Sequence, residues 1–149
     1  MRVAIIEDQP TSQAVVARAL GEAGLDYFFA TSLVDGMAET ALRDPDIVLL
    51  DLGLPNSKGI ATLKSWLEIV PRDVPVIVLS GHEDLSAACI EEGADGFFPK
   101  GRELSLLVEM IQQAVSRAAC RREYQTAAVA EFRKHIEDIK QKMGLTNGP

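Results

Sequence analysis

Five short apolar segments alternate with five segments of helical spacing, and this alternation restricts the fold more than any other feature of the sequence. Because parallel strands are joined by crossover connections that are usually helices, it predicts an α/β fold, a doubly wound five-stranded parallel (βα)5 sheet covered on both faces. The predicted strands span residues 2–6, 27–30, 47–51, 74–79 and 96–98, and the predicted helices span residues 11–23, 33–43, 57–70, 84–92 and 103 onward.

Composition excludes several classes of protein. The hydrophobic share of 47% is ample for a folded core, and the formal net charge of −7 argues against direct nucleic acid binding. Two cysteines suggest no disulfide framework, and no stretch approaches the roughly 20 apolar residues of a membrane span. We therefore expect a cytoplasmic protein with no membrane contact.

Polar residues follow the apolar runs at four of the five strand ends. Glu7 and Asp8 follow the first strand, Asp51 ends the third, Ser80 follows the fourth and Lys100 follows the fifth. In open α/β sheets, ligands collect at the carboxyl ends of the strands. Taken alone, Asp51 could simply cap the turn that follows it. Together with the other four residues, it predicts a shared site at this edge.

Three carboxylates at one edge repel one another, and a single lysine cannot balance them. Mg²⁺ accepts one or two carboxylates together with water and a phosphate oxygen, so a magnesium ion is the expected cofactor. A hydroxyl and an ammonium group could hold the remaining oxygens of a phosphoryl group. This constellation predicts that a carboxylate accepts a phosphoryl group.

With these landmarks in order, the chain resembles the receiver domains of response regulators in two-component signal transduction, which share a flavodoxin-like fold. The resemblance covers about residues 1–118. It implies that Asp51 is the phosphoacceptor, loaded by a histidine kinase or a histidine phosphotransfer protein. It also implies a signalling switch rather than an enzyme, with only self-catalysed phosphotransfer and autodephosphorylation.

The same resemblance assigns roles to the remaining site residues. Glu7, Asp8 and Asp51 would bind Mg²⁺ together with the backbone carbonyl of Gly53. Ser80 would hydrogen-bond the phosphoryl oxygen, Lys100 would pair with it, and the small Gly81 would leave room for the phosphoryl donor. Phe97 would be the aromatic switch that turns inward as Ser80 moves, and its alternative is a plain core residue.

In the family that the chain resembles, two positions modulate the lifetime of the phosphorylated aspartate, and here they are Gly53 and His82. Gly53, the second residue after Asp51, has no side chain to shield the phosphoryl group or to steer water. His82, the second residue after Ser80, is the other position that modulates this lifetime in the family. The lifetime therefore does not follow from the sequence.

Apolar residues continue at alternating spacings of four and three along the last helix, with no Pro or Gly between Glu103 and Met143. This period predicts a C-terminal helical extension at residues 119–143 that forms a coiled coil, most simply in a homodimer, before a flexible tail at 144–149. Arg122 and Gln125 interrupt the apolar positions, so the helix could alternatively break there and fold back. Residues 119–149 hold six Lys or Arg against four Asp or Glu, so the negative charge lies in residues 1–118.

Two other functions remain open at this point. Phosphatases with an Asp nucleophile and Mg²⁺ usually carry a second Asp two residues later as general acid, where this chain has Gly53. A receiver-like interaction module that is never phosphorylated is the third candidate. The chain could act alone through protein contacts, or as the N-terminal part of a protein with an output module beyond Pro149.

Overall fold

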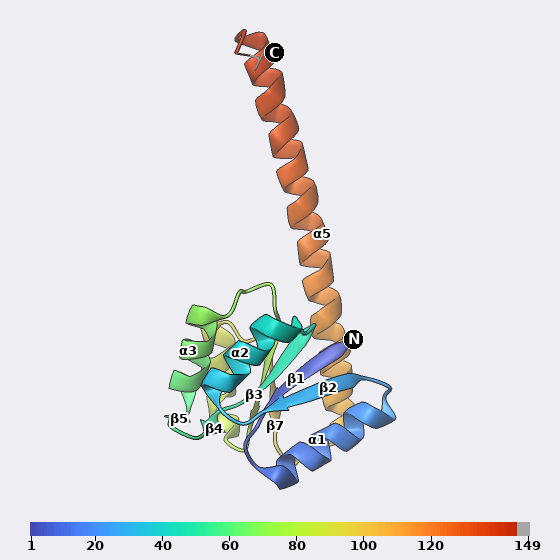
Figure 1. Ribbon diagram of the computed structural model, residues 1–149, viewed down its shortest axis with the longest axis vertical. Coiled ribbons are helices and arrows are strands. Elements are labelled where there is room, and N and C mark those ends of the chain that lie inside the picture. The colour runs from blue at the N-terminus through green and yellow to red at the C-terminus, as the bar shows by residue number, and fades with distance from the viewer. Residues whose placement is uncertain (146–149) are drawn as a thin grey trace. The chain divides into compact units, whose positions relative to one another are not determined.

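The computed structural model describes residues 1–145, and the chain divides into two compact units, of which the first is Met1–Ser116 and the second begins at Arg117 (Figure 1). The strands of the main sheet are β1 (Arg2–Ile6), β2 (Asp26–Ala30), β3 (Ile47–Asp51), β6 (Val76–Ser80) and β7 (Gly96–Pro99). The helices of the first unit are α1 (Pro10–Glu22), α2 (Leu33–Arg43), α3 (Ile60–Ile69), the 3₁₀ turn η1 (Glu83–Leu85), α4 (Ser86–Glu92) and the first turns of α5 (Leu104–Lys142).

The five strands form one parallel sheet in the order β2-β1-β3-β6-β7. This order confirms the predicted doubly wound α/β fold. Strand β3 is central, and every one of its residues is buried. The continuous apolar run before Asp51 is what a strand covered on both faces requires.

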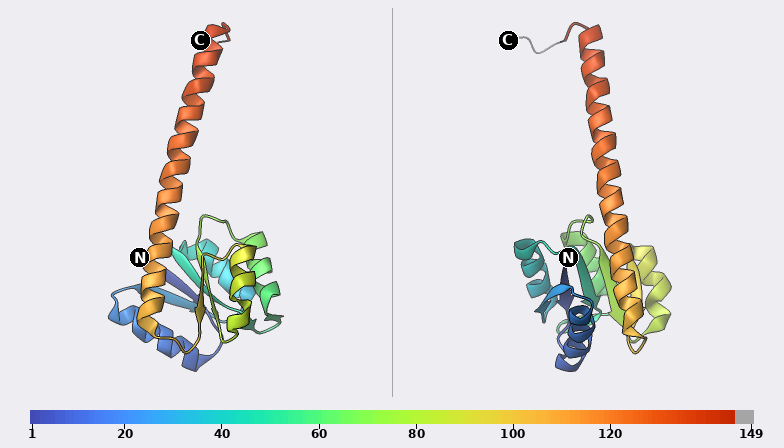
Figure 2. Two further views of the ribbon diagram at one scale, coloured as in Figure 1. Left: turned by 180° about the vertical axis from the view of Figure 1, so that it is seen from behind. Right: turned by 90° about the vertical axis from the view of Figure 1, so that its right-hand side faces the viewer.

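Helices cover both faces of the sheet, and alternate strand residues point to opposite cores. Ala4, Ile6, Val48 and Leu50 face a core closed by α2, α3 and α4, where the single tryptophan, Trp66, is buried. Val3, Ile5, Ile47 and Leu49 face a second core closed by α1 and the first turns of α5. The left view of Figure 2 shows α1 and these turns on one side of the sheet and α3 and α4 on the other.

The predicted helix at residues 57–70 begins later than expected. Ser57–Lys58 (β5) pairs antiparallel with Gly53–Leu54 (β4), and α3 starts only at Ile60. Gly59 has φ 68°, a conformation that favours glycine, and it separates this small hairpin from the helix. The predicted helix at 84–92 likewise begins as the 3₁₀ turn η1 before α4.

Within the second unit, α5 continues without a break through Arg122 and Gln125 to Lys142. Among the residues that the structure describes, no helix is both long and apolar enough to cross a membrane. Of the tail predicted at 144–149, residues 146–149 lie outside the described part of the chain.

Helix α2 approaches β1 closely at Gly36. A Cβ atom at this position would lie 2.9 Å from Cδ1 of the buried Ile6, whereas nothing lies within 4 Å of a Cβ at Gly21 in α1. Alanine favours a helix over glycine by about 1 kcal/mol, but overpacking a core costs about 1–3 kcal/mol. We expect Gly36→Ala to be less stable than Gly21→Ala by at least about 1 kcal/mol in urea unfolding. Adding Ile6→Val, which removes Cδ1, should reduce the destabilisation that Gly36→Ala causes. If Gly36→Ala and Gly21→Ala stabilised the protein equally, the close approach of α2 to β1 would be contradicted.

Candidate functional site

The register of the sheet brings the acidic residues to one level. Ile6 of β1 pairs with Leu50 of β3. The residues that follow them, Glu7 and Asp51, therefore lie side by side at the carboxyl edge of the sheet. One carboxylate oxygen from each of Glu7, Asp8 and Asp51 lies within 4.8 Å of the other two. The structure therefore brings together the three predicted acidic residues.

Lys100 reaches this acidic cluster from the end of β7. Its backbone N–H donates to the carbonyl of Ser80 at 2.8 Å, which fixes the end of β7 against β6. Its ammonium Nζ lies 2.8 Å from Oε2 of Glu7 and 3.4 Å from Oδ1 of Asp51. One cation is thus shared between two buried carboxylates.

Backbone groups hold two of the carboxylates, while the third keeps a free oxygen. Oε1 of Glu7 accepts the N–H of Gln9 at 3.0 Å, and Oδ1 of Asp51 accepts the N–H of Gly53 at 3.2 Å. Oδ1 of Asp8 is buried and has no hydrogen-bond partner among the described residues. Buried polar atoms are nearly always satisfied, and a set of carboxylate oxygens suits a hard divalent cation, so these residues fit Mg²⁺.

The chain after Asp51 is anchored by residues that the sequence did not single out. The carbonyl of Leu52 accepts the N–H of Gly59 at 2.9 Å, and the fully buried Thr62 donates its hydroxyl to the same carbonyl at 3.4 Å. Ser57 and Thr62 join their hydroxyl groups at 2.8 Å. A threonine inside the helix predicted at 57–70 was the available signal, but its partner depends on the β4–β5 hairpin.

The predicted phosphoryl-binding residues lie around this edge. Ser80 is buried, and its hydroxyl oxygen accepts the N–H of His82 at 3.1 Å, so its own proton remains available to a phosphoryl oxygen. Gly81 is exposed, and nothing lies within 4 Å of where its Cβ would be. At Gly53 a Cβ would lie 3.8 Å from Oδ2 of Asp51, so a side chain here would start beside the carboxylate.

Phe97 is buried in the core that α2, α3 and α4 close, while its neighbour Phe98 lies in the opposite core. The Phe97 ring therefore faces inward, as the ring of a core residue does. Its role as a switch stays a prediction.

Burial dominates the electrostatics of the site. Loss of hydration raises the pKa of Glu7, partly offset by the hydrogen bonds from Lys100 and the Gln9 N–H, and the charge of Asp51 raises it further. For Lys100, burial lowers the pKa, but the hydrogen bond to Glu7 and the charges of Asp51 and Glu7 outweigh it, so the net pKa is raised. The site thus favours a bound proton or another positive charge.

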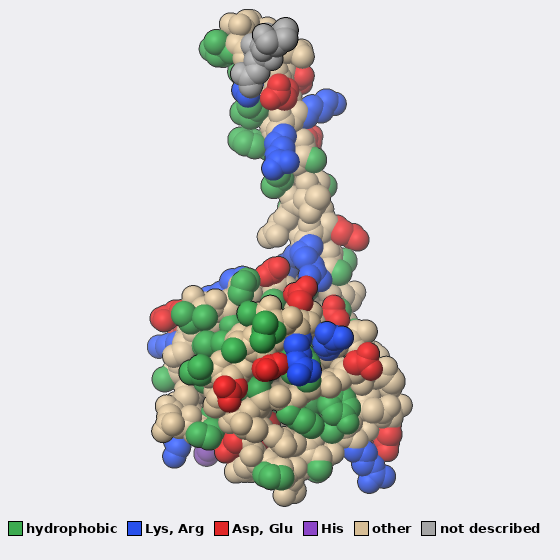
Figure 3. Space-filling model, in the orientation of Figure 1, with side chains coloured by type: hydrophobic (Ala, Val, Ile, Leu, Met, Phe, Trp, Pro, Cys, Tyr) green, Lys and Arg blue, Asp and Glu red, His purple; other side chains and the backbone are tan. Residues whose placement is uncertain are grey.

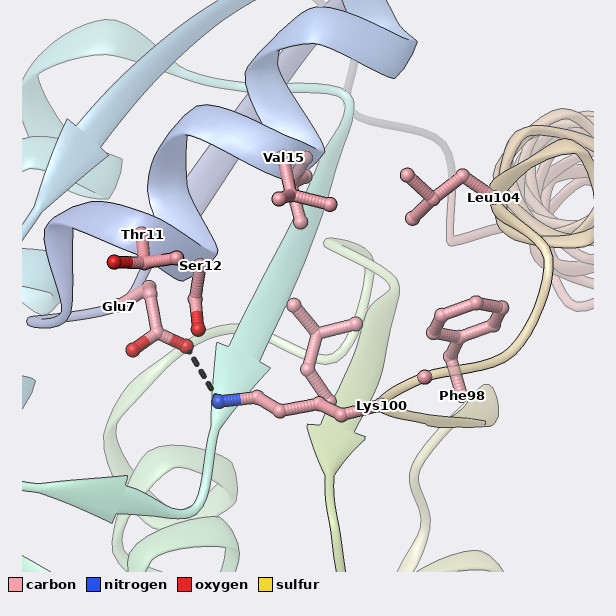
Figure 4. Close-up of a pocket in the computed structure, with 10 residues that line it drawn as sticks. Glu7, Thr11, Ser12, Val15, Phe98, Lys100 and Leu104 are labelled. Carbon is pink, nitrogen blue, oxygen red and sulfur yellow. Dashed lines mark hydrogen bonds and ion pairs between the residues drawn. The ribbon is translucent and has the colours of Figure 1, made fainter.

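A small cavity of about 150 Å³ adjoins the Glu7–Lys100 ion pair on the side of α1 (Figure 4). Thr11, Ser12 and Val15 of α1 line one wall, and Leu104 and Phe98 lie opposite. Neither Asp8 nor Asp51 lines it, so the cavity meets the acidic cluster only at Glu7.

Comparison with known families gives one clear match. The response regulator receiver domain matches residues 3–112. The KDP operon transcriptional regulatory protein KdpE of Escherichia coli is 37% identical over 131 residues, which cover 85% of this chain and 54% of KdpE. The DNA-binding transcriptional regulator NtrC of Salmonella typhimurium is 31% identical over 114 residues, or 75% of this chain and 24% of NtrC. The chain thus spans about half of KdpE and a quarter of NtrC.

Solved structures agree with this match. A response regulator receiver domain from Clostridium thermocellum has a TM-score of 0.71 at 25% identity, covering 80% of this chain and 97% of that one. NtrX from Brucella abortus has a TM-score of 0.74 at 25% identity, covering 85% of this chain and 29% of that one.

Replacing Lys100 by methionine should lower the free energy of unfolding, because the neighbouring carboxylates then repel one another without a compensating cation. Without metal, we expect a loss of about 1–3 kcal/mol in the free energy of unfolding at pH 7, because Glu7 loses its charged donor. Lys64→Met is the matched control. Lys64 forms an exposed ion pair with Glu92 at 3.6 Å, so its replacement should cost less than about 1 kcal/mol.

The loss at Lys100 should depend on pH. Because the pKa of Glu7 is raised, the folded state binds the Glu7 proton more tightly than the unfolded state does. Below the folded pKa of Glu7 the carboxyl group is neutral, so the ion pair with Lys100 contributes to stability only above that pKa. Lys100 in turn stabilises the fold below its unfolded pKa of about 10.5 and loses this effect as the pH rises through its raised folded value. Urea unfolding should therefore show a smaller difference between parent and Lys100→Met near pH 4.5 than at pH 7. A difference that does not change with pH would contradict the shared ion pair.

Proposed function

Because this chain belongs to the response regulator receiver domain family, we propose that Asp51 is its phosphoacceptor. Receiver domains of this family are phosphorylated by histidine kinases, and we propose a histidine kinase or a histidine phosphotransfer protein as the donor here. The observation that carries the proposal is the buried Asp51 carboxylate, which lies 3.4 Å from the Lys100 ammonium and within the acidic cluster. A nucleophilic carboxylate next to a fixed cation is suited to phosphoryl transfer.

We propose that Glu7, Asp8 and Asp51 hold a Mg²⁺ ion together with the backbone carbonyl of Gly53. The partnerless Oδ1 of Asp8 and the mutual closeness of the three carboxylates support this assignment. When bound, the ion would neutralise the carboxylates and the oxygens of the transferred group.

We propose roles for the other residues that their positions support. The Asp51 carboxylate oxygen forms a bond to phosphorus while the bond from phosphorus to the donor histidine nitrogen breaks, and that nitrogen keeps the electron pair. Lys100 holds the charge on one phosphoryl oxygen, and the Ser80 hydroxyl donates to another. Gly81 leaves space above Asp51 for the donor.

Phosphorylation would then favour one of two arrangements near Ser80 and Phe97, which changes the surface that a partner or a downstream output contacts. The family is one of signalling domains, and we propose that this chain catalyses only its own phosphotransfer and dephosphorylation. An Asp-dependent phosphatase is disfavoured because Gly53 stands where its general acid would be.

The output is a separate question. KdpE and NtrC are named as transcriptional regulators, but this chain matches only part of each. We propose that its own output passes through protein contacts in the cytoplasm, without direct nucleic acid binding or membrane contact. The domain limits of 1–118, 119–143 and 144–149 and a homodimer through the C-terminal helix stay predictions.

Phosphorylation can be tested with acetyl phosphate and Mg²⁺ on a Phos-tag gel. We expect the parent protein to shift and Asp51→Asn to remain unshifted, because an amide is not a phosphoacceptor. Asp73→Asn, an exposed residue outside the acidic cluster, is the matched control and should shift like the parent. An Asp51→Asn protein that shifts fully would defeat the assignment, and turnover of an aryl phosphate would favour the phosphatase.

Metal binding can be measured without phosphorylation. At ten times its dissociation constant, Mg²⁺ should stabilise the folded protein by about 1.4 kcal/mol, seen as a higher Tm than in NaCl of equal ionic strength. Asp8→Asn should lose most of this gain, whereas Asp73→Asn should keep it. The same gain in Asp8→Asn and the parent would remove Asp8 from the metal site.

A further inference from the structure

The second unit carries an apolar stripe on the surface of α5 that the receiver function does not explain. We call it the seam, and it consists of Val129, Phe132, Ile136, Ile139 and Met143. These residues follow a heptad spacing, with Val129, Ile136 and Met143 at a positions and Phe132 and Ile139 at d positions. Phe132 and Met143 are each 65% exposed and Val129 is 49% exposed, so the seam has no cover within the described chain.

Basic residues border the seam on both sides. Arg133 and Lys140 occupy the e positions on one side, and His135 and Lys142 occupy the g positions on the other. The acidic residues of this stretch occupy the b and c positions, farther from the seam: Glu131, Glu137 and Asp138. Figure 3 shows hydrophobic side chains along one edge of this helix with Lys and Arg side chains beside them.

This arrangement disfavours a second copy of the same helix. In a parallel coiled coil, g residues face e residues of the other helix, so His135 would face a lysine. In an antiparallel pair, e faces e and g faces g, which again opposes basic residues. Arg122 at an a position would add a buried like-charge contact in the parallel pair.

The same arrangement favours another helix, rather than a lipid surface, as the binding partner of the seam. Helices that lie in a membrane surface usually combine an apolar face with a polar face rich in Lys and Arg, whereas the outer face here holds three of the stretch's acidic residues. The seam is also a narrow a/d stripe, the form that inserts between the side chains of another helix.

We propose that the seam binds an α-helix of another protein that has apolar residues at a and d positions and Asp or Glu at e and g positions. Such a partner would form ion pairs with Arg133, Lys140 and Lys142, for which a second copy of this helix offers no acidic residue at the e and g positions. Charge complementarity of this kind sets partner choice in coiled coils.

The test uses the full chain and two fluorescent peptides of residues 117–145. One peptide has the natural sequence. The other, the acid peptide, carries Glu in place of Ala128, which faces Arg133 in a parallel pair, and in place of the basic residues beside the seam, namely Arg121, Arg133, His135, Lys140 and Lys142. We expect the acid peptide to bind the chain at least about tenfold more tightly than the natural peptide in fluorescence anisotropy. Higher NaCl should weaken that binding, because exposed ion pairs are screened.

Two neighbouring residues provide a matched pair of variants. Arg133→Glu changes a charge beside the seam, and Lys134→Glu makes the same change on the outer face. We expect Arg133→Glu to weaken acid-peptide binding about fivefold and Lys134→Glu to leave it unchanged. Phe132→Ala should weaken it as well, while an acid peptide of scrambled sequence should not bind.

Other occupants give different results. Equal binding of the natural and acid peptides, or a chain dimer in sedimentation that Phe132→Ala dissolves, would overturn the proposal in favour of a second copy. Co-sedimentation of the chain with phosphatidylcholine–phosphatidylserine vesicles, without acid-peptide binding, would overturn it in favour of a lipid surface. Equal effects of Arg133→Glu and Lys134→Glu would remove the role of the flanking charges. Because no phosphoryl donor is present, these results are independent of whether Asp51 is phosphorylated.

Discussion

One ammonium group stands against three carboxylates at the carboxyl edge of the sheet, and the receiver site is organised by this imbalance. Lys100 lies close to Glu7 and Asp51, but the buried Oδ1 of Asp8 has no partner among the described residues. In water such a group would be solvated, whereas here the folded sheet holds it next to two like charges. The fold therefore gathers negative charge at a place where a bound cation or a proton would be stabilised.

The sheet could be predicted from sequence because its strongest signals are local. The apolar run at 47–50 is too short and too uniform for an amphipathic helix, and Asp51 follows it directly. Parallel strands end at the same edge, so five polar residues at five chain positions predicted one site. The structure brings Glu7, Asp8, Asp51 and Lys100 together as that argument required.

The missing details depend on contacts between distant residues or on short, weak elements. The hairpin at Gly53–Leu54 and Ser57–Lys58 has only two residues in each strand, so no periodicity marks it, and helix propensity at 57–58 pointed the other way. The burial of Phe97 depends on which core its strand residue faces. The homodimer, predicted from the apolar spacing, stays a prediction, and the charges beside the seam bear on it because α5 runs unbroken past Arg122 and Gln125.

The burial of the only tryptophan has a practical consequence for spectroscopy. Trp66 lies inside the core of the first unit, and α5 beyond Arg117 contains no indole. Changes in its emission on heating or in urea therefore follow the receiver core, whereas far-ultraviolet circular dichroism records the helices of both units. If the two signals change at different temperatures, the two units melt separately, and a single Tm does not describe the chain.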